Sequence, residues 1–259
     1  MKPAVKINLN PKVSIITPVY NASNFISQMI ESVVSQTYKN WEIIFVDDCS
    51  SDDSVEIIKS FIKEEPRISL YLLDVNSGSG IARNKAIEKA SGRYIAFLDS
   101  DDIWSPEKLS TQIEFMLTNS VAFSHTSYGY IDEKGNKIKT TFKVKKKVTY
   151  YDLLKRTEIS CLTAVYDSLL IGKYYMSEHR KKQDYALWLN ILRDGCFSYG
   201  INKELAYYRQ VKNSSTSKKH RLIIKHVSFL KKTQGFSTIK AMYYTLYWFK
   251  NGIIRYLIK

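Results

Sequence analysis

The first hundred residues alternate between short apolar runs and amphipathic segments, and this alternation restricts the fold more than any other feature of the chain. The apolar runs are typical of buried strands and lie at residues 13–17, 41–46, 68–73 and 94–98. Segments with helical spacing separate them, beginning near residue 23, near residue 52 and at residue 81. Short connections and right-handed crossovers then predict an α/β fold in which helices flank a parallel, doubly wound sheet.

Polar clusters follow all four predicted strands. They are Tyr20 with Asn21, Asp47 with Asp48, residues 76–80, and residues 99–102. Parallel strands place their carboxyl ends along one edge of the sheet, where proteins of this architecture bind ligands. We therefore expect the four clusters to converge on one binding site.

The cluster after the fourth strand contains three carboxylates within four positions, Asp99, Asp101 and Asp102. Their repulsion is costly unless a cation lies among them or the site is open to water. Carboxylate oxygens at a strand end suit Mg²⁺ or Mn²⁺, ions that bind few protein ligands together with the phosphates of a substrate. The alternative is a solvated loop in which Asp102 or Ser105 caps the next helix. The expected place at the binding edge favours a metal site facing a phosphorylated ligand.

The glycine pattern excludes a dinucleotide-binding fold. That fold needs G-x-G-x-x-G directly after the first strand, whereas Pro18 to Asn21 occupies that turn here. Gly78 and Gly80 come two units later, and Arg83 stands in place of the third glycine. A nucleotidyltransferase remains an alternative, although its first loop is usually rich in glycine and carries a basic residue.

Charge is unevenly distributed along this chain, whose net charge is +14. Residues 1–120 hold 12 basic and 16 acidic side chains, a net of −4, whereas residues 121–259 hold 27 and 9, a net of +18. Such a basic half predicts an anionic partner, either a lipid surface or nucleic acid. A non-enzymatic protein that binds lipid or nucleic acid is therefore a second alternative. The three cysteines are widely spaced, which favours a reducing cytosol over a disulfide framework.

The parallel pattern ends after residue 102. The sequence predicts further helices and strands at residues 107–117, 122–131, 150–156, 160–166 and 184–194, the second and fourth of these as strands. Asp184 lies at the start of the last helix, where a helix cap is the simplest interpretation. His220 and His226 fall in the next helical region, and we expect solvated positions with no functional role for both.

Five motifs together resemble an inverting family-2 glycosyltransferase of the GT-A fold, over roughly residues 12–215. The motifs are residues 13–21, 46–52, 76–78, 82–84 and 97–102. The resemblance implies a Rossmann-like, mostly parallel sheet with an acceptor-side subdomain. It also implies a division into a nucleotide-sugar-binding half at 1–118, an acceptor and catalytic-base half at 119–217, and a basic amphipathic helical tail at 218–259.

The resemblance assigns the donor site residue by residue. Tyr20 would stack on the uracil ring of a nucleotide-sugar, and Asp48 would accept a hydrogen bond from the ring N–H. Arg83 would lie near the donor phosphate or sugar, although a helix-surface arginine fits the sequence as well. Asp101 would hold Mn²⁺ or Mg²⁺ against the diphosphate. The donor would also contact Pro18, Asn76, Gly78, Asp99, Ser100 and Asp102. For Asp48 the alternative is a cap for the turn at Ser50.

The resemblance also assigns the catalytic base. The family commonly carries a Glu-Asp pair at this point, here Gln183 and Asp184, and Asp184 keeps the base role. Residues 207–215 resemble the loop that closes over the donor. Many relatives have a histidine there, and Gln210 or Val211 in its place leaves open whether a third protein group ligates the metal.

The tail combines aromatic, aliphatic and basic residues. Only nine residues between Lys240 and Lys250 run without charge, far fewer than the ~20 of a spanning helix. Residues 236–259 instead have the composition of a helix in an anionic membrane interface, with packing on the catalytic domain as the alternative. We therefore expect a cytoplasmic protein, peripheral on the inner face of the cell membrane, with no nucleic-acid partner. The resemblance further implies a non-processive enzyme that moves one hexose (Glc, Gal or HexNAc) from a UDP-sugar to an undecaprenyl diphosphate-linked saccharide in O-antigen or capsule assembly.

Overall fold

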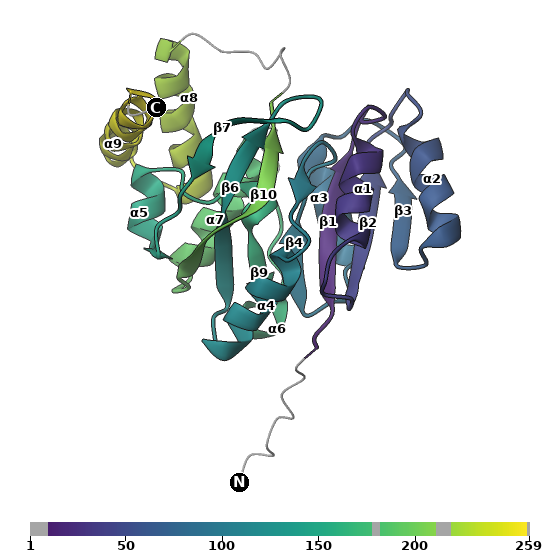
Figure 1. Ribbon diagram of the computed structural model, residues 1–259. Coiled ribbons are helices and arrows are strands. Elements are labelled where there is room, and N and C mark those ends of the chain that lie inside the picture. Colours follow the sequence, from purple (N-terminus) through teal and green to yellow (C-terminus); the bar gives the residue numbers. More distant parts are fainter. Residues whose placement is uncertain (1–9, 178–181, 211–218, 258–259) are drawn as a thin grey trace.

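Ten strands form one sheet in the computed structural model, which describes residues 10–177, 182–210 and 219–257 (Figure 1). Eight of them follow the order β3-β2-β1-β4-β9-β6-β10-β5, while β7 pairs with β6 and β8 with β10. The strands are β1 (Val13–Val19), β2 (Trp41–Asp47), β3 (Ile68–Leu72), β4 (Tyr94–Phe97), β5 (Ile103–Trp104), β6 (Phe123–Ile131), β7 (Lys137–Phe142), β8 (Lys147–Val148), β9 (Val165–Asp167) and β10 (Ser198–Arg209).

The first four strands are parallel, which confirms the sequence prediction. The runs of β1, β2 and β4 are almost entirely buried because both faces of the sheet are covered there, whereas the edge strand β3 buries only Ile68. Ile15 belongs to one buried cluster and its neighbour Ile16 to the other. The connecting helices are α1 (Ile26–Val34), α2 (Ser54–Glu64) and α3 (Ser79–Lys89). This doubly wound half places the carboxyl ends of its strands at one edge.

Strands β6 and β10, in the second half of the sheet, also have their carboxyl ends at that edge. Strand β9 is antiparallel to both β4 and β6, so β6 runs in the same direction as β4, and the long β10 is parallel to β6. The remaining helices are α4 (Lys108–Thr118), α5 (Tyr150–Lys155), α6 (Ser168–Ile171), α7 (Gln183–Arg193), α8 (Lys219–Gln234) and α9 (Thr238–Leu257). One mostly parallel sheet therefore carries strands from both halves of the predicted division.

Helix α7 is anchored in the core by an aromatic contact. The ring of Trp188 lies 5.2 Å from that of Phe97 on β4 and 5.2 Å from that of Phe123 on β6, measured between centroids. The hydroxyl of Tyr185 donates to the carbonyl of Leu153 on α5 at 2.8 Å. These contacts fix the beginning of α7 relative to the sheet edge.

The C-terminal helices pack against α5, at the side of the molecule away from α2 (Figure 1). On α9, the indole N–H of Trp248 donates to the hydroxyl of Thr157 at 3.0 Å, and the side chain of Asn251 donates to the carbonyl of Lys155 at 2.9 Å. Among the described residues, no helix has the length and apolar character that crossing a bilayer requires.

Two expectations and one alternative from the sequence analysis are wrong in detail. The strand expected at 160–166 is a 3₁₀ turn, Cys161–Thr163, followed by the short β9, because this segment supplies only an inserted antiparallel strand. Neither Asp102 nor Ser105 caps α4, whose N-cap residue is Glu107 and has no side-chain cap. His226 is fully buried, because α8 turns this side chain toward α9.

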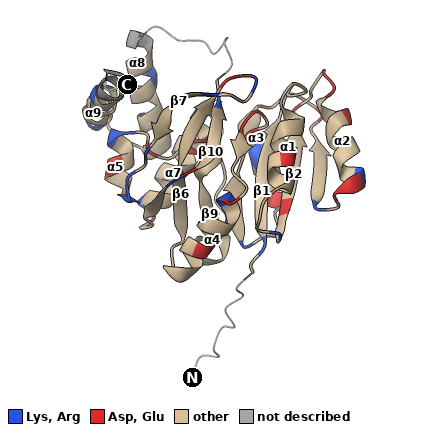
Figure 2. Cartoon of the chain, in the orientation of Figure 1, with Lys and Arg blue, Asp and Glu red and all other residues tan. Residues whose placement is uncertain are grey.

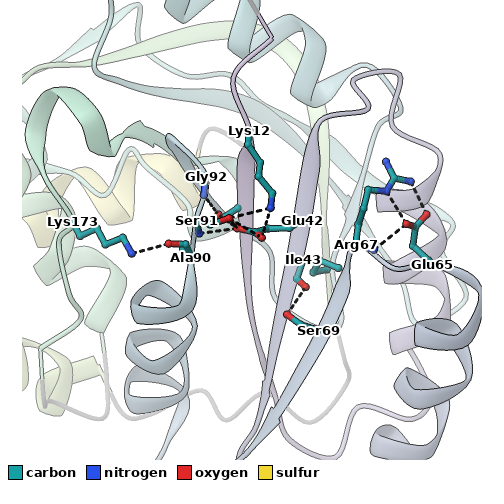
Figure 3. A network of polar contacts seen from close by, with 11 residues as sticks. Lys12, Glu42, Ile43, Glu65, Arg67, Ser69, Ala90, Ser91, Gly92 and Lys173 are labelled. Carbon is teal, nitrogen blue, oxygen red and sulfur yellow. Dashed lines mark hydrogen bonds and ion pairs between the residues drawn. The ribbon is translucent and has the colours of Figure 1, made fainter. Parts of the chain in front are cut away.

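Paired polar groups hold the amino edge of the sheet (Figure 3). The Nζ atom of Lys12 lies 2.6 Å from Oε2 of Glu42. The other carboxylate oxygen, Oε1, accepts from the Ser91 backbone N–H at 2.8 Å. Gly92 is required here, because a Cβ atom would lie 2.7 Å from the carbonyl oxygen of Lys12. Farther along the edge, Arg67 bonds Glu65 at 2.6 Å. This edge is held by pairs of opposite charge.

Candidate active site

Two adjoining cavities lie at the carboxyl edge of the sheet. One has a volume of about 210 Å³ and is lined by Pro18, Val19, Tyr20, Asp48, Ser100 and Asp101. The other has about 290 Å³ and is lined by Asp102, Ser160, Cys161, Leu162, Lys182, Gln183, Asp184 and Tyr208. Ser79, Arg83 and Asp99 line both. The structure therefore brings together the predicted site residues except Asn76 and Gly78. These two do not line a cavity but donate hydrogen bonds to Asp48.

Asp48 organises the loop between β3 and α3. Its carboxylate accepts from the backbone N–H of Ser77 at 2.6 Å and of Gly78 at 2.8 Å, and Asn76 donates to its carbonyl at 2.9 Å. Gly78 has φ 92°, a conformation that favours glycine. Asp47, rather than Asp48, accepts from the backbone N–H of Ser50 at 2.9 Å, so the capping alternative for Asp48 is wrong.

Tyr20 follows β1 with 55% of its surface exposed. A tyrosine that packed into the core would be covered, whereas this side chain contributes to the first cavity and remains open to solvent. Such a ring can stack on a planar group that enters the cavity.

Arg83 and Asp99 form an ion pair on the boundary between the cavities, with 2.5 Å between Nη2 and Oδ1. Burial by itself would lower the pKa of Arg83, but the charge and hydrogen bond of Asp99, together with Cys161 and Asp184, outweigh it and raise that pKa. Only 8% of Arg83 is exposed, so the helix-surface alternative is wrong. Its Nε atom is buried without a partner among the described residues. The guanidinium thus lines both cavities with one N–H that no described residue accepts from.

The carboxylates of Asp99, Asp101 and Asp102 lie close together after β4, and nearby positive charges offset only part of their repulsion. Burial, and next the charge of Asp99, raise the pKa of Asp101 to about 6. Burial, followed by the charges of Asp101 and Asp99, raises the pKa of Asp102 well above its ordinary value. A divalent cation would relieve this repulsion, so the cluster suits one. No group of three or more His, Cys, Asp or Glu side chains within the described ranges could hold an ion alone, and phosphate oxygens would have to complete its shell.

Arg209, which the sequence motifs do not single out, fastens this acidic loop. It is the last residue of β10 and 2% exposed. Its Nε atom donates to the carbonyl of Asp101 at 2.7 Å, and its backbone N–H donates to the carboxylate of Asp102 at 2.9 Å. Nη1 donates to the carbonyl of Asp132 at 3.0 Å, and Nη2 to Gln28 at 2.8 Å. The only sequence signal for Arg209 was its place within residues 207–215, which resemble the loop that closes over the donor.

Asp184 lies in the first turn of α7 and lines the second cavity. Burial raises its pKa, and the charge of Arg83 opposes that rise. Gln183, which departs from the expected pair, accepts from the hydroxyl of Ser79 at 3.1 Å. Gly80 lets α3 and α7 approach, because a Cβ atom there would lie 2.6 Å from Nε2 of Gln183. The start of α7 is therefore joined to the start of α3.

The predicted loop at 207–215 lies partly outside the described residues. Tyr208 lines the second cavity, and the backbone N–H of Gln210 donates to the carbonyl of Ile131 at 2.8 Å. Val211 and the residues up to 215 are not among those described.

Comparison with protein families gives one match over most of the chain. The family described as "Glycosyl transferase family 2" matches residues 14–176, a range that includes Tyr20, Asp48, Arg83 and the acidic loop. Asp184 and Arg209 lie beyond the matched range.

Individual relatives agree with this match. The chain is 41% identical over 246 residues to "Putative teichuronic acid biosynthesis glycosyltransferase TuaG" of Bacillus subtilis, covering 95% of this chain and 98% of that protein. It is 45% identical over 187 residues to "UDP-Glc:alpha-D-GlcNAc-diphosphoundecaprenol beta-1,3-glucosyltransferase WfgD" of Escherichia coli, covering 72% of each.

A solved structure shares the fold. The mannosyltransferase PcManGT of Pyrobaculum calidifontis, in complex with GDP-Man and Mn²⁺, aligns with a TM-score of 0.67 at 16% identity. The alignment covers 93% of this chain and 70% of that one. At this identity the likeness concerns architecture alone.

Proposed function

This chain belongs to glycosyltransferase family 2, and from that premise we propose that it transfers a single hexose, with inversion, from a UDP-sugar to a lipid-linked saccharide. The observation that carries the proposal is the meeting of the two cavities at Arg83 and Asp99, with Asp101 in one and Asp184 in the other. WfgD, by its name, uses UDP-Glc and an acceptor linked to diphosphoundecaprenol, which supports the same substrate classes here. Membership of the family argues against a nucleotidyltransferase and against a purely basic binding protein.

The first cavity would take the nucleoside diphosphate. Tyr20 stacks on the uracil ring, and the carboxylate of Asp48 faces the ring N–H. Arg83 donates to the phosphate or sugar of the donor, while Asp99 accepts from sugar or ribose hydroxyls. Asp101 would hold a bound Mn²⁺ or Mg²⁺, whose contribution is to neutralise charge on the departing UDP.

The second cavity would take the acceptor, and Asp184 would act as the general base. Its carboxylate accepts the proton of the attacking hydroxyl while that oxygen bonds to C1 of the sugar. The bond from C1 to the phosphate oxygen breaks, and its electron pair leaves with UDP. One displacement inverts the anomeric centre and needs no protein nucleophile. A raised pKa improves Asp184 as a proton acceptor, and alignment of the two substrates supplies much of the remaining acceleration.

A membrane surface would explain the exposed apolar residues of the C-terminal helices. They are Ile224 on α8 and Ile239, Met242, Tyr243 and Leu246 on α9. A groove of about 240 Å³ between the helices is lined by several of these side chains. Figure 2 shows basic positions on α8 and α9 and acidic ones on α1 and α2. An apolar face beside positive charge is typical of a helix that lies in an anionic interface.

Vesicle sedimentation tests the membrane part. We expect the protein to bind vesicles of phosphatidylglycerol and to leave vesicles of phosphatidylcholine in solution. Leu246→Asp should abolish that binding while activity on a detergent-soluble acceptor stays the same. Equal binding to both kinds of vesicle, or to neither, would contradict an anionic membrane surface.

A donor panel tests the reaction itself. The protein is incubated with UDP-glucose, UDP-galactose, UDP-GlcNAc, GDP-mannose and dTDP-glucose, each with a GlcNAc-diphospho-lipid analogue, with and without Mn²⁺. We expect transfer from one UDP-sugar only, stimulated by the metal, with a product of inverted anomeric configuration by NMR. Transfer from a non-uridine donor, or retention of configuration, would refute the corresponding part of the proposal.

A further inference from the structure

Lys182 connects the start of α7 to both C-terminal helices. Its Nζ atom lies 2.8 Å from Nδ1 of His226 on α8. It also lies 4.1 Å from the centroid of the Trp248 ring on α9 and 5.6 Å from that of Phe229 on α8. Lys182 precedes Asp184 by two residues and lines the same cavity. A cation so close to the proposed base is thus held by helices that lie far along the chain.

The three rings form a stack around the ammonium group. His226 lies 4.2 Å from Trp248 and 5.8 Å from Phe229 between ring centroids. Burial, and next the charge of Lys182, lower the pKa of His226 to about 3, so its imidazole is neutral and Nδ1 accepts from the ammonium. Burial lowers the pKa of Lys182 to about 8, against the charge of Asp184. Lys182 is therefore mainly charged at neutral pH, and cation–π attraction is strongest where water is excluded.

The backbone at Lys182 also depends on its surroundings. The residue is the N-cap of α7 and has φ 58° and ψ 34°, in the left-handed region that is unfavourable for residues other than glycine. Its carbonyl accepts the helical bond from the N–H of Ala186 at 3.0 Å. The next side chain, Gln183, bonds Ser79 of α3. The first turn of α7 is thus held by α3 through Gln183 and by α8 and α9 through Lys182.

We propose that Lys182 is a positioning residue for the carboxylate of Asp184, and that His226, Phe229 and Trp248 form an aromatic clamp that completes the active site by holding it. The proposal rests on the proposed function, in which Asp184 is the base. It assigns the C-terminal helices a catalytic task besides contact with a membrane. On α9, Trp248 contacts Lys182 and His226, whereas Ile239, Met242 and Leu246 are exposed and remain free for a membrane.

Kinetics of the full chain test the clamp, with a GlcNAc-diphosphate acceptor that carries a short alkyl chain and without vesicles. Lys182→Met and Trp248→Leu should each lower kcat about tenfold or more and leave the KM of the donor unchanged. Lys182→Arg and Trp248→Phe should restore most of the loss, because they keep the cation and the ring. The double variant should be no slower than the slower single variant, since both changes break one contact. Lys232→Met, which removes the same charge from an exposed position of α8, serves as the control.

Hydrogen exchange tests the clamp independently of transfer. In Trp248→Leu the amides of residues 184–187 should exchange faster, whereas Lys232→Met should leave them as in the wild type. If Trp248→Leu fails to fold, His226→Gln provides the same test. The proposal is overturned if a folded Lys182→Met variant keeps turnover within about twofold of wild type, if the losses multiply in the double variant, or if exchange at 184–187 is unchanged. A wild-type protein that transfers no sugar would refute the proposed function instead, and the exchange experiment would still decide the clamp.

Discussion

The pKa values of Glu42, at the amino edge of the sheet, and of Asp101 and Asp184, at its carboxyl edge, are shifted in opposite directions. At the amino edge, burial would raise the pKa of Glu42, but hydrogen bonds from Lys12, Ser14 and Ser91 outweigh it and lower that pKa (Figure 3). At the carboxyl edge, burial raises the pKa of Asp101 to about 6 and also raises that of Asp184. Carboxylates with lowered pKa values stabilise the folded state at neutral pH, and those with raised values destabilise it.

This contrast separates stability from function within one fold. Charged groups that are fully paired within the protein, as Glu42 is at the amino edge, have few hydrogen-bonding positions free for a ligand. At the carboxyl edge the carboxylates of Asp101, Asp102 and Asp184 are incompletely compensated by the protein, which is typical of functional sites. Substitutions at the two edges should therefore have opposite consequences.

The largest expected effect is that of Asp184→Asn. The amide cannot accept the proton of the acceptor, so the transfer rate should fall by roughly a thousandfold. Thermal stability should be unchanged or higher, because a partly buried charge is removed. Transfer assays, UDP binding and thermal melting of the same preparation check this. Glu42→Gln is the matched control at the other edge, and a substantial residual rate in Asp184→Asn would rule out the base role.

Arg209→Met should affect both properties, because this residue is paired like the amino edge but lies at the carboxyl edge. Its loss leaves the carbonyls of Asp101 and Asp132 and the side chain of Gln28 without their donor, which should cost about 3 kcal/mol of unfolding free energy. Metal-dependent UDP binding should also weaken, since the Asp101 loop loses its anchor. Urea unfolding and calorimetry measure the two effects. Arg193→Met, an exposed change of the same kind, should show neither effect, and a stable Arg209→Met would contradict the anchoring role.

Glu42→Gln should lower stability and spare activity. We expect a loss of about 1–3 kcal/mol at neutral pH with a transfer rate close to wild type. The folded pKa of Glu42 is lowered, so its contribution is present above the ordinary value of 4.5 and is lost as the pH falls through the lowered pKa. The difference between variant and wild type should thus shrink below that value. Unfolding curves across this range measure it, with the exposed Glu56→Gln as the control, and a constant difference would contradict the pairing.

Local pattern was enough to predict the first half of the molecule. Each strand of residues 12–102 is a mainly apolar run, and each is followed by its polar cluster. The sheet and the convergence of Tyr20, Asp48 and Asp101 therefore followed from short stretches of sequence. Asp184 came from the resemblance to a family rather than from spacing.

Features that depend on distant partners could not be predicted. The short β9 exists because it fits between β4 and β6. His226 is buried because Trp248 and Lys182 meet it from other elements, and nothing in the surrounding helix pattern indicates this. The role of Arg209 depends on the carbonyl of Asp101, which lies 108 residues earlier in the chain.

Calorimetry of UDP binding tests the central claim most directly. The wild-type protein and Asp101→Asn are each titrated with UDP in Mn²⁺ and again in EDTA. We predict that Mn²⁺ tightens binding to the wild type by about tenfold or more, roughly 1.4 kcal/mol, and that Asp101→Asn loses this dependence. Equal affinity with and without the metal in the wild-type protein, or an unchanged metal dependence in Asp101→Asn, would contradict the account of the carboxyl edge.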